Sequence, residues 1–233
     1  MAGKKKEVID LSSTLSDIWR ILTDAEREML RSSARIVQFK KNEAIYIEND
    51  VPKYLMCLFN GKVKILKSGI GGRSQIIRII RPMQYFGYRA YFARENYVTA
   101  AMAFESCTVC MIPMELIEKF LRKNGNLALL FIQLLSVDLG VADQRIVNLT
   151  QKHVRGRLAE SLLALMESYG LEEDGATINI YLAREDLANL SNMTTSNAIR
   201  TLSNFVNERI IAIDGRKIKI IDEERLHKIS RMG

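Results

Sequence analysis

The sequence predicts an α+β protein built from an N-terminal β-roll of the jelly-roll type, a long dimerisation helix and a C-terminal winged helix-turn-helix domain. Three observations support this fold class. Short alternating apolar runs separated by turn signals fill the first half, and a long apolar helical stretch follows. Residues 182–221 then predict two short helices around a tight turn and a basic hairpin. We place the three parts at residues 1–114, 115–150 and 151–233.

The roll is predicted from short strands and the turns between them. Turn signals occur at three places: Asn60-Gly61, residues 69–72 and Arg81-Pro82. Apolar residues alternate within residues 63–67 and 76–80. A helical entry over residues 13–33 precedes the strands and has apolar side chains at helical spacing: Leu15, Ile18, Trp19 and Leu22. We expect Trp19 to pack in the core and not to form a ligand platform.

The long helix between the two halves is too apolar on one side for a solvated surface. Its apolar residues recur at helical spacing: Leu127, Leu130, Phe131, Leu134, Leu135, Val137, Val141 and Ile146. The helix could cover the roll of its own chain, or pair with the same helix of a second copy in a parallel coiled-coil-like dimer. We favour the dimer, with all of these residues except Val137 and Ile146 named as its interface, because helix-turn-helix proteins usually bind as dimers.

Residues 182–221 are the most informative part of the sequence about function, because they contain the pattern of a helix-turn-helix. Asn192 suits the corner between two helices, where one residue needs a positive φ. Thr194 can accept an N–H bond at the start of the second helix, which then begins near Thr195. Three apolar residues form the inner stripe of that helix: Ala198, Leu202 and Phe205. Four polar residues face the opposite way: Ser196, Arg200, Ser203 and Asn207.

Small polar side chains around one arginine suit the major groove of DNA. Arg200 can bond to guanine O6 and N7 together, worth about 1–3 kcal/mol of discrimination, and the Ser and Thr side chains can contact base edges or phosphates. In the hairpin, Asp214-Gly215 is the turn signal, and Arg216 and Lys217 are expected to face the phosphate backbone. An amphipathic helix alone would indicate only a surface helix. Corner, cap, polar face and basic wing occurring in order favour DNA binding.

Composition bounds the class of protein. The 233 residues suggest two domains, and 48% hydrophobic residues support real cores. The net charge of +7 is weak evidence for DNA binding, because residues 151–233 hold 12 cations and 12 anions. The three cysteines are expected to be buried thiols in a reducing compartment: Cys57, Cys107 and Cys110. No apolar run is judged to reach membrane-spanning length, so we expect a cytoplasmic protein without a membrane partner.

The order of roll, long helix and winged helix-turn-helix resembles the Crp/Fnr family of bacterial transcription regulators over nearly the whole chain. Four motifs carry the resemblance: Asn60-Gly61-Lys62-Val63, residues 81–87 (RPMQYFG), residues 154–159 (VRGRLA) and residues 184–188 (REDLA). The resemblance implies base contacts from Thr195, Ser196 and Arg200, of which only the arginine is kept in kind, and a DNA-backbone contact from Arg184. It implies a homodimer that reads a pseudo-palindromic operator with half-sites about 34 Å apart. RNA polymerase is a further partner that the resemblance admits.

The roll departs from the pattern of the family's cyclic-nucleotide-binding members, in which a Glu holds the ribose and an Arg holds the cyclic phosphate. Tyr88 stands at the position of that Glu and Val98 at the position of that Arg, so cyclic AMP is not expected. Arg89 with Thr99 leaves a different small anionic effector open. We favour the alternative, in which Arg89 is a solvated or ion-paired surface side chain.

No cofactor, metal site or catalytic site is predicted. Three cysteines are too few for an iron–sulfur cluster with four thiolates, and His153 and His227, each alone, are expected to be surface residues and not haem or metal ligands. No nucleophile stands with a base, and no phosphate-binding glycine loop leads into a helix. The competing interpretation is a β-roll protein that binds a small molecule or a protein partner and uses its helical C-terminal part for assembly alone.

Overall fold

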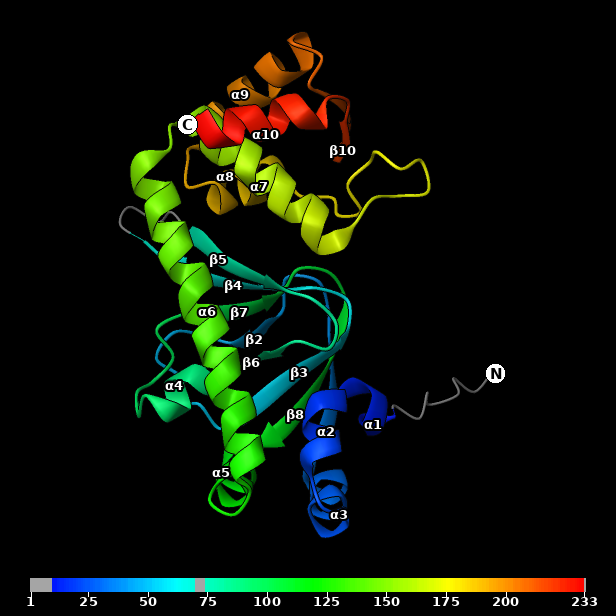
Figure 1. Ribbon diagram of the computed structural model, residues 1–233, viewed down its shortest axis with the longest axis vertical. Helices are drawn as coiled ribbons and strands as arrows, with labels where there is room; N and C mark the ends of the chain where they lie inside the picture. The colour runs from blue at the N-terminus through cyan, green and yellow to red at the C-terminus, as the bar shows by residue number, and fades with distance from the viewer. Residues whose placement is uncertain (1–9, 70–73, 233) are drawn as a thin grey trace. The chain divides into compact units, whose positions relative to one another are not determined.

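The computed structural model describes residues 10–69 and 74–232, and its contacts divide the chain into two compact units (Figure 1). The first unit comprises residues 1–68 and 77–138, and the second comprises residues 69–76 and 139–233. The boundary falls after Asp138, inside the long helix α6 (Gly125–Gln151). This helix therefore belongs partly to each unit, whereas the sequence analysis treats residues 115–150 as a region of their own.

The first unit holds a roll of two four-stranded sheets. One sheet has the order β1-β8-β3-β6, with β1 at Arg35–Phe39, β8 at Cys107–Pro113, β3 at Tyr54–Asn60 and β6 at Tyr85–Phe86. The other has the order β2-β7-β4-β5, with β2 at Ala44–Tyr46, β7 at Ala100–Ala103, β4 at Val63–Ser68 and β5 at Ser74–Ile80. The predicted all-β roll is thus confirmed.

Glycine is required at the predicted turn between β3 and β4. Gly61 has φ +80°, and an added Cβ would lie 2.5 Å from the carbonyl oxygen of Ser106. A larger residue would therefore be both strained and in collision with backbone. The second predicted turn, over residues 69–72, lies mostly outside the described residues.

The predicted helical entry forms three helices instead of one continuous stretch: α1 (Leu11–Thr14), α2 (Ser16–Ile21) and α3 (Asp24–Ser33). The last break occurs at Thr23, whose hydroxyl accepts the Glu26 N–H while the Glu26 carboxylate accepts the Thr23 N–H. This capping box starts α3 afresh. Leu15 and Ile18 are fully buried, and Trp19 packs against the same core, as predicted.

All three cysteines are buried and free. Cys57 on β3 lies opposite Cys110 on β8 in the strand register. Burial raises the pKa of the Cys107 thiol to about 11 and that of Cys110 to about 12, so both stay protonated near neutral pH. They behave as small apolar side chains of the core, as predicted from the sequence.

Two of the six residues predicted for the dimer face of α6 are buried inside their own chain and are not available for pairing. Leu127 and Phe131 are buried in the core of their own chain, and three more of the predicted residues pack partly against it: Leu130, Leu134 and Leu135. The Phe131 ring meets the rings of Tyr88 and Phe92 from α4 (Tyr88–Phe92) edge-on. Of the six predicted interface residues, only Val141 is clearly exposed, at 57%. This stripe covers the roll, which is the alternative that the sequence analysis ranks second.

A second apolar face of α6 remains exposed: Leu129, Ile132, Val137, Leu139, Val141, Ile146 and Val147. The helix is apolar on opposite sides, so periodicity in the sequence does not tell which stripe faces the chain's own core. By length and composition α6 could also cross a membrane, with a mean hydropathy of 1.7 over its most apolar window. That finding contradicts the prediction that no apolar run is long enough. Only 11% of the window is buried inside the structure.

The two faces of α6 predict opposite mutational behaviour. Phe131→Ala removes a fully packed ring and should lower the free energy of unfolding by about 3–5 kcal/mol at every protein concentration. Leu139→Ala on the exposed face should matter only through association, so its effect should vanish on dilution. Urea unfolding at several protein concentrations checks both. A concentration-dependent loss for Phe131→Ala would contradict this assignment of the faces.

Candidate nucleic-acid interface

The helix-turn-helix forms where the sequence predicts it. Helices α8 (Arg184–Leu190) and α9 (Thr195–Asn207) meet at a corner in which Asn192 has φ +50°. The Thr194 hydroxyl accepts the Asn197 N–H at 3.2 Å and caps α9. Corner residue, cap and first helical residue are therefore all confirmed. The cap contributes about 1 kcal/mol to the start of this helix.

The inner face of α9 holds it against the rest of the domain. The three predicted inner residues are buried: Ala198, Leu202 and Phe205. The Arg155 guanidinium of α7 (Val154–Tyr169) lies over the Phe205 ring, 4.8 Å from its centre. Arg155 also donates to both carboxylate oxygens of Glu208, and Arg225 of α10 (Glu223–Met232) reaches the same carboxylate at 3.1 Å. These contacts fix the C-terminal end of α9 between two other helices.

The outer face of α9 is exposed and polar, as predicted: Thr195, Ser196, Arg200, Ser203 and Asn207. Arg200 donates through Nη2 to the Asn197 side-chain oxygen at 2.9 Å, so its guanidinium is held along this face. Ile199 lies on the same face and is 48% exposed, which the sequence analysis missed. Ile199 is three residues after Ser196 and four residues before Ser203, and this helical spacing could have placed it on the same face from the sequence. An exposed aliphatic group beside an arginine can contact a thymine methyl group.

The wing is a two-stranded hairpin of β9 (Ile211–Asp214) and β10 (Lys217–Ile220). Asp214 pairs with Lys217, so the loop is Gly215-Arg216, one residue later than the Asp-Gly signal suggests. Gly215 has φ +56°, as a two-residue hairpin loop that begins with glycine requires. Arg184 at the start of α8 donates through Nη2 to the Gly215 carbonyl at 2.7 Å and so fixes the wing tip.

The predicted cations of the wing behave differently from one another. Arg216 is exposed at the tip. Lys217 instead lies 3.1 Å from the Glu172 carboxylate, over the Tyr181 ring, and the hydrogen bond to Glu172 raises the pKa of Lys217. Lys217 is thus engaged within its own chain, whereas Arg216 is not paired with Glu172, and the phosphate contacts of both stay predictions. Sequence separation of 45 residues hides the Glu172 partner from local pattern analysis.

Arg157 of α7 is the structural residue of the site that the sequence analysis did not single out. Its guanidinium donates to the carbonyl oxygens of Ser191 and Asn192 at 3.1 Å each, which are the corner residues of the helix-turn-helix. It also donates to the Lys152 carbonyl at 2.9 Å, just beyond the end of α6. One side chain therefore fixes the corner and the end of α6 at the same time. Only the three-dimensional structure shows these partners, because they are backbone carbonyls.

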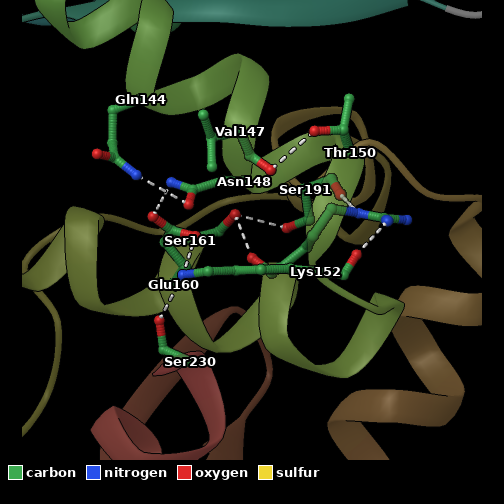
Figure 2. Close-up of polar contacts among 10 residues, drawn as sticks. Gln144, Val147, Asn148, Thr150, Lys152, Glu160, Ser161, Ser191 and Ser230 are labelled. Atoms are coloured by element: carbon green, nitrogen blue, oxygen red, sulfur yellow. Dashed lines mark hydrogen bonds and ion pairs between the residues drawn. The ribbon is translucent and has the colours of Figure 1, made fainter. Parts of the chain in front are cut away.

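Further side chains extend this contact into a network (Figure 2). The Glu160 carboxylate of α7 accepts from Asn148 of α6 and from Lys152, the latter at 2.8 Å. Ser191 at the corner donates to the Ser161 hydroxyl at 2.9 Å. The last turns of α6 and the corner before α9 are thus joined by one continuous set of polar contacts. The end of α6 and the corner that precedes the recognition helix α9 are therefore in direct hydrogen-bonded contact.

The predicted effector residues of the roll lie in a set of internal contacts. Asp138 of α6 accepts from Arg78 at 2.5 Å and from the Tyr88 hydroxyl at 3.2 Å. Burial raises the pKa of Tyr88, so this hydroxyl remains a donor. Arg89 forms an ion pair with Glu95 at 2.8 Å, which agrees with the favoured structural interpretation of Arg89.

The two remaining effector residues flank a pair of stacked rings. The Thr99 hydroxyl lies 3.5 Å from the hydroxyl of Tyr46, whose ring stacks on Tyr97 with centres 3.8 Å apart. Val98 is 42% exposed and offers no charge at the position of the family's phosphate-binding arginine.

Comparison with known proteins agrees with this geometry. Residues 36–124 match the cyclic nucleotide-binding domain model, and residues 156–229 match the Crp-like helix-turn-helix domain model. The anaerobic regulatory protein of Bacillus subtilis is 28% identical over 80% of this chain and 79% of its own length. The CRP-like cAMP-activated global transcriptional regulator of Mycobacterium tuberculosis is 23% identical over 84% and 88%.

Solved structures show the same fold. FixK2 from Bradyrhizobium japonicum superposes with a TM-score of 0.76 over 84% of this chain and 96% of its own, at 23% identity. A Crp/Fnr-family regulator from Eubacterium rectale superposes with a TM-score of 0.77 over 92% and 97%, at 18% identity. Fold and site together define a regulator that joins a cyclic-nucleotide-binding-type roll to a Crp-like helix-turn-helix. The chain belongs to the Crp/Fnr family of bacterial transcription regulators.

The corner of the helix-turn-helix gives a stability prediction. Asn192→Ala should lower the free energy of unfolding by about 1–2 kcal/mol, because alanine is poorly accommodated at φ +50°. Asn192→Gly, the matched control, should be neutral or slightly stabilising at this φ. Denaturant unfolding of the two variants compares them directly. Equal losses for alanine and glycine would mean that the asparagine side chain, and not its backbone conformation, is needed.

The carboxylates of this domain predict acid sensitivity. Hydrogen bonds from the Thr177 and Ala176 N–H groups hold the pKa of Asp174 far below its usual range, and the Arg155 hydrogen bond lowers that of Glu208. A carboxylate whose pKa is lower in the folded state than in the unfolded state contributes stability above the ordinary carboxyl pKa of about 4. That contribution is lost as the pH falls through the lowered pKa. The free energy of unfolding should therefore decrease below about pH 5. Asp174→Asn, which removes this titrating carboxylate, should flatten the dependence, and acid unfolding monitored by circular dichroism measures it.

Proposed function

We propose that this protein acts as a homodimer that binds a pseudo-palindromic DNA operator through α9 of each copy. The outer face of α9 carries the proposal. It presents Arg200, oriented by Asn197, between exposed hydroxyl groups and the aliphatic side chain of Ile199. Charged, hydroxyl and methyl groups on one exposed helix face supply the contacts that distinguish base pairs in the major groove.

Other residues of the domain are proposed to position the protein on the DNA backbone. Arg216 at the wing tip and the hydroxyl groups of Thr194 and Thr195 can contact phosphates, which fix register without reading sequence. Arg184 holds the wing tip through the Gly215 carbonyl, and its Nη1 atom has no acceptor among the described residues. We assign Arg184 a wing-positioning role beside the backbone contact that the resemblance implies.

The exposed apolar face of α6 is proposed to pair with the same face of a second copy. A soluble protein rarely leaves such a continuous apolar surface without a partner. Helix-turn-helix dimers place two recognition helices about 34 Å apart, in successive turns of the same DNA groove. Because Arg157 and Glu160 join the end of α6 to the corner before α9, the geometry of the paired helices would set the geometry of the two reading heads.

The roll is proposed to act without cyclic AMP. The positions that would hold a cyclic nucleotide carry Tyr88 and Val98, and Tyr88 already donates to Asp138 of α6. The protein is then either competent without a ligand or responsive to a different, small anionic effector, and we propose no bound cofactor. RNA polymerase is proposed as a further partner, and the cytoplasm as the compartment in which the protein works.

Operator selection from a random duplex library, at near-physiological salt, tests the proposal and supplies a probe. Against that probe, Arg200→Ala should weaken binding by about 1–3 kcal/mol and relax the preference at one position of each half-site. Arg216→Ala is the matched control, since loss of a phosphate contact should weaken all sequences equally and reduce the salt dependence. Fluorescence anisotropy across a salt series separates the two effects.

Two results would count against the proposal. No enriched palindrome from a confirmed dimer, with or without cell extract, would exclude sequence-specific binding. Unchanged specificity for Arg200→Ala would exclude this face of α9 as the reader. Either result would favour the alternative in which the helical part serves assembly alone.

A further inference from the structure

The loop between α7 and α8, residues 171–181, lies along the wing. Its Ile178 N–H donates to the Ile218 carbonyl of β10 at 2.9 Å. In the other direction, the Ile220 N–H of β10 donates to the Ala176 carbonyl, also at 2.9 Å. The loop therefore adds a short third segment to the edge of β10. Side chains of the loop are placed directly beside side chains of the wing.

The wing carries three cations, and the loop is paired with two of them. Lys217 and Lys219 occupy alternate, exposed positions of β10, with buried residues between them, so both point away from the core. Nζ of Lys217 lies 3.1 Å from the Glu172 carboxylate, and Nζ of Lys219 lies 3.2 Å from the Asp174 carboxylate. Arg216 has no hydrogen bond or ion pair with any residue that the structure describes.

The carboxylate of Glu172 is held in place by a second contact. The Tyr181 hydroxyl donates to it, and Nζ of Lys217 lies over the Tyr181 ring, 5.3 Å from its centre. The hydrogen bond from Tyr181, followed by that from Lys217, lowers the pKa of Glu172, so this side chain is ionised at neutral pH. The Glu172 N–H donates to the Thr177 carbonyl at 2.7 Å, which fixes the backbone. Lys217 therefore meets a charged and oriented carboxylate.

The two carboxylates of the loop differ in their other contacts. Asp174 accepts the N–H groups of Ala176 and Thr177 at 3.0 and 2.8 Å, so it shapes its own loop. Among the described residues, the Glu172 carboxylate accepts only from side chains. Replacing Glu172 therefore removes its charge without removing a bond that forms the loop.

We propose that Glu172 competes with DNA phosphates for Lys217 and so lowers the sequence-independent part of the DNA affinity. The inference rests on the proposed function, in which the wing lies beside the DNA backbone. A lysine that reaches a phosphate releases counterions from the DNA and strengthens binding to every sequence alike. A lysine that is already neutralised by Glu172 adds little to this release. A larger share of the binding free energy then comes from the base contacts of α9.

Binding to a labelled duplex of mixed sequence, without the selected operator, measures this competition. Fluorescence anisotropy should show that Glu172→Gln binds about two- to fivefold more tightly at low salt. The slope of log affinity against log salt should steepen by about 0.9 for each bound copy, because Lys217 is released to a phosphate. Glu173→Gln is the matched control, since it removes the same charge from the neighbouring exposed residue, which has no partner among the described residues. It should leave the slope unchanged.

Variants of the lysine test whether Glu172 acts through this partner. Lys217→Ala alone should change the salt slope little, because the pair with Glu172 already neutralises the lysine. In the Glu172→Gln protein, Lys217→Ala should abolish the gain in affinity and in slope. A gain that persists without Lys217 would overturn the inference. A slope that is flatter by about 0.9 for Lys217→Ala alone would also overturn it, since Lys217 would then contact a phosphate despite Glu172.

The outcomes separate the inference from the proposed function. Equal slopes for the unmodified protein, Glu172→Gln and Glu173→Gln, all of which bind the duplex, would overturn the competition and leave DNA binding standing. An equal steepening for both glutamine variants would mean a general effect of net charge and would overturn it as well. The absence of salt-dependent binding to any duplex by any folded variant would overturn the proposed function together with the inference. Circular dichroism establishes that each variant is folded.

Discussion

The structure depends on one constraint: helix α6 is apolar on two opposite sides, and a single chain can cover only one of them. Leu127 and Phe131 are covered by the roll, where Phe131 meets the rings of Tyr88 and Phe92. The face that carries Ile132, Leu139 and Ile146 is not covered by the residues that the structure describes. Burial of such a face is worth about 25 cal/mol per Å² of apolar surface, so a second helix is strongly favoured. The proposed pairing with a second copy would bury this face without a separate dimerisation element.

Helix α6 is also connected to the helix-turn-helix. Its last turns end at Lys152, and Arg157 joins the Lys152 carbonyl to the carbonyls of Ser191 and Asn192. These bonds connect the end of α6 directly to the corner of the helix-turn-helix. A ligand in the roll would act on this device only by binding one arrangement of the helices better than another. The bonds of Asp138 to Arg78 and Tyr88 are the internal contacts such a ligand would have to compete with or reinforce.

The helix-turn-helix could be predicted because its signals lie within a short stretch of sequence. Contacts between residues far apart in the sequence could not be predicted. Asn192, Thr194 and the stripe of Ala198, Leu202 and Phe205 follow from φ preference, capping and helical period, which a sequence displays directly. Which stripe of α6 faces the roll does not follow, because both stripes are apolar and only packing decides between them. The Glu172 partner of Lys217 and the backbone acceptors of Arg157 are likewise invisible in a local pattern.

Charge balance in the C-terminal part makes the dimer decisive for DNA binding. Residues 151–233 hold equal numbers of cations and anions, and Lys217 and Lys219 are paired with Glu172 and Asp174. Few cations remain to hold one reading head on DNA through phosphate contacts alone. Two linked heads gain from effective concentration, since the second half-site is bound without a further loss of translational freedom. In the proposed dimer, a domain with modest electrostatic attraction would therefore gain specific affinity mainly as a pair, and the paired α6 helices would link the two heads.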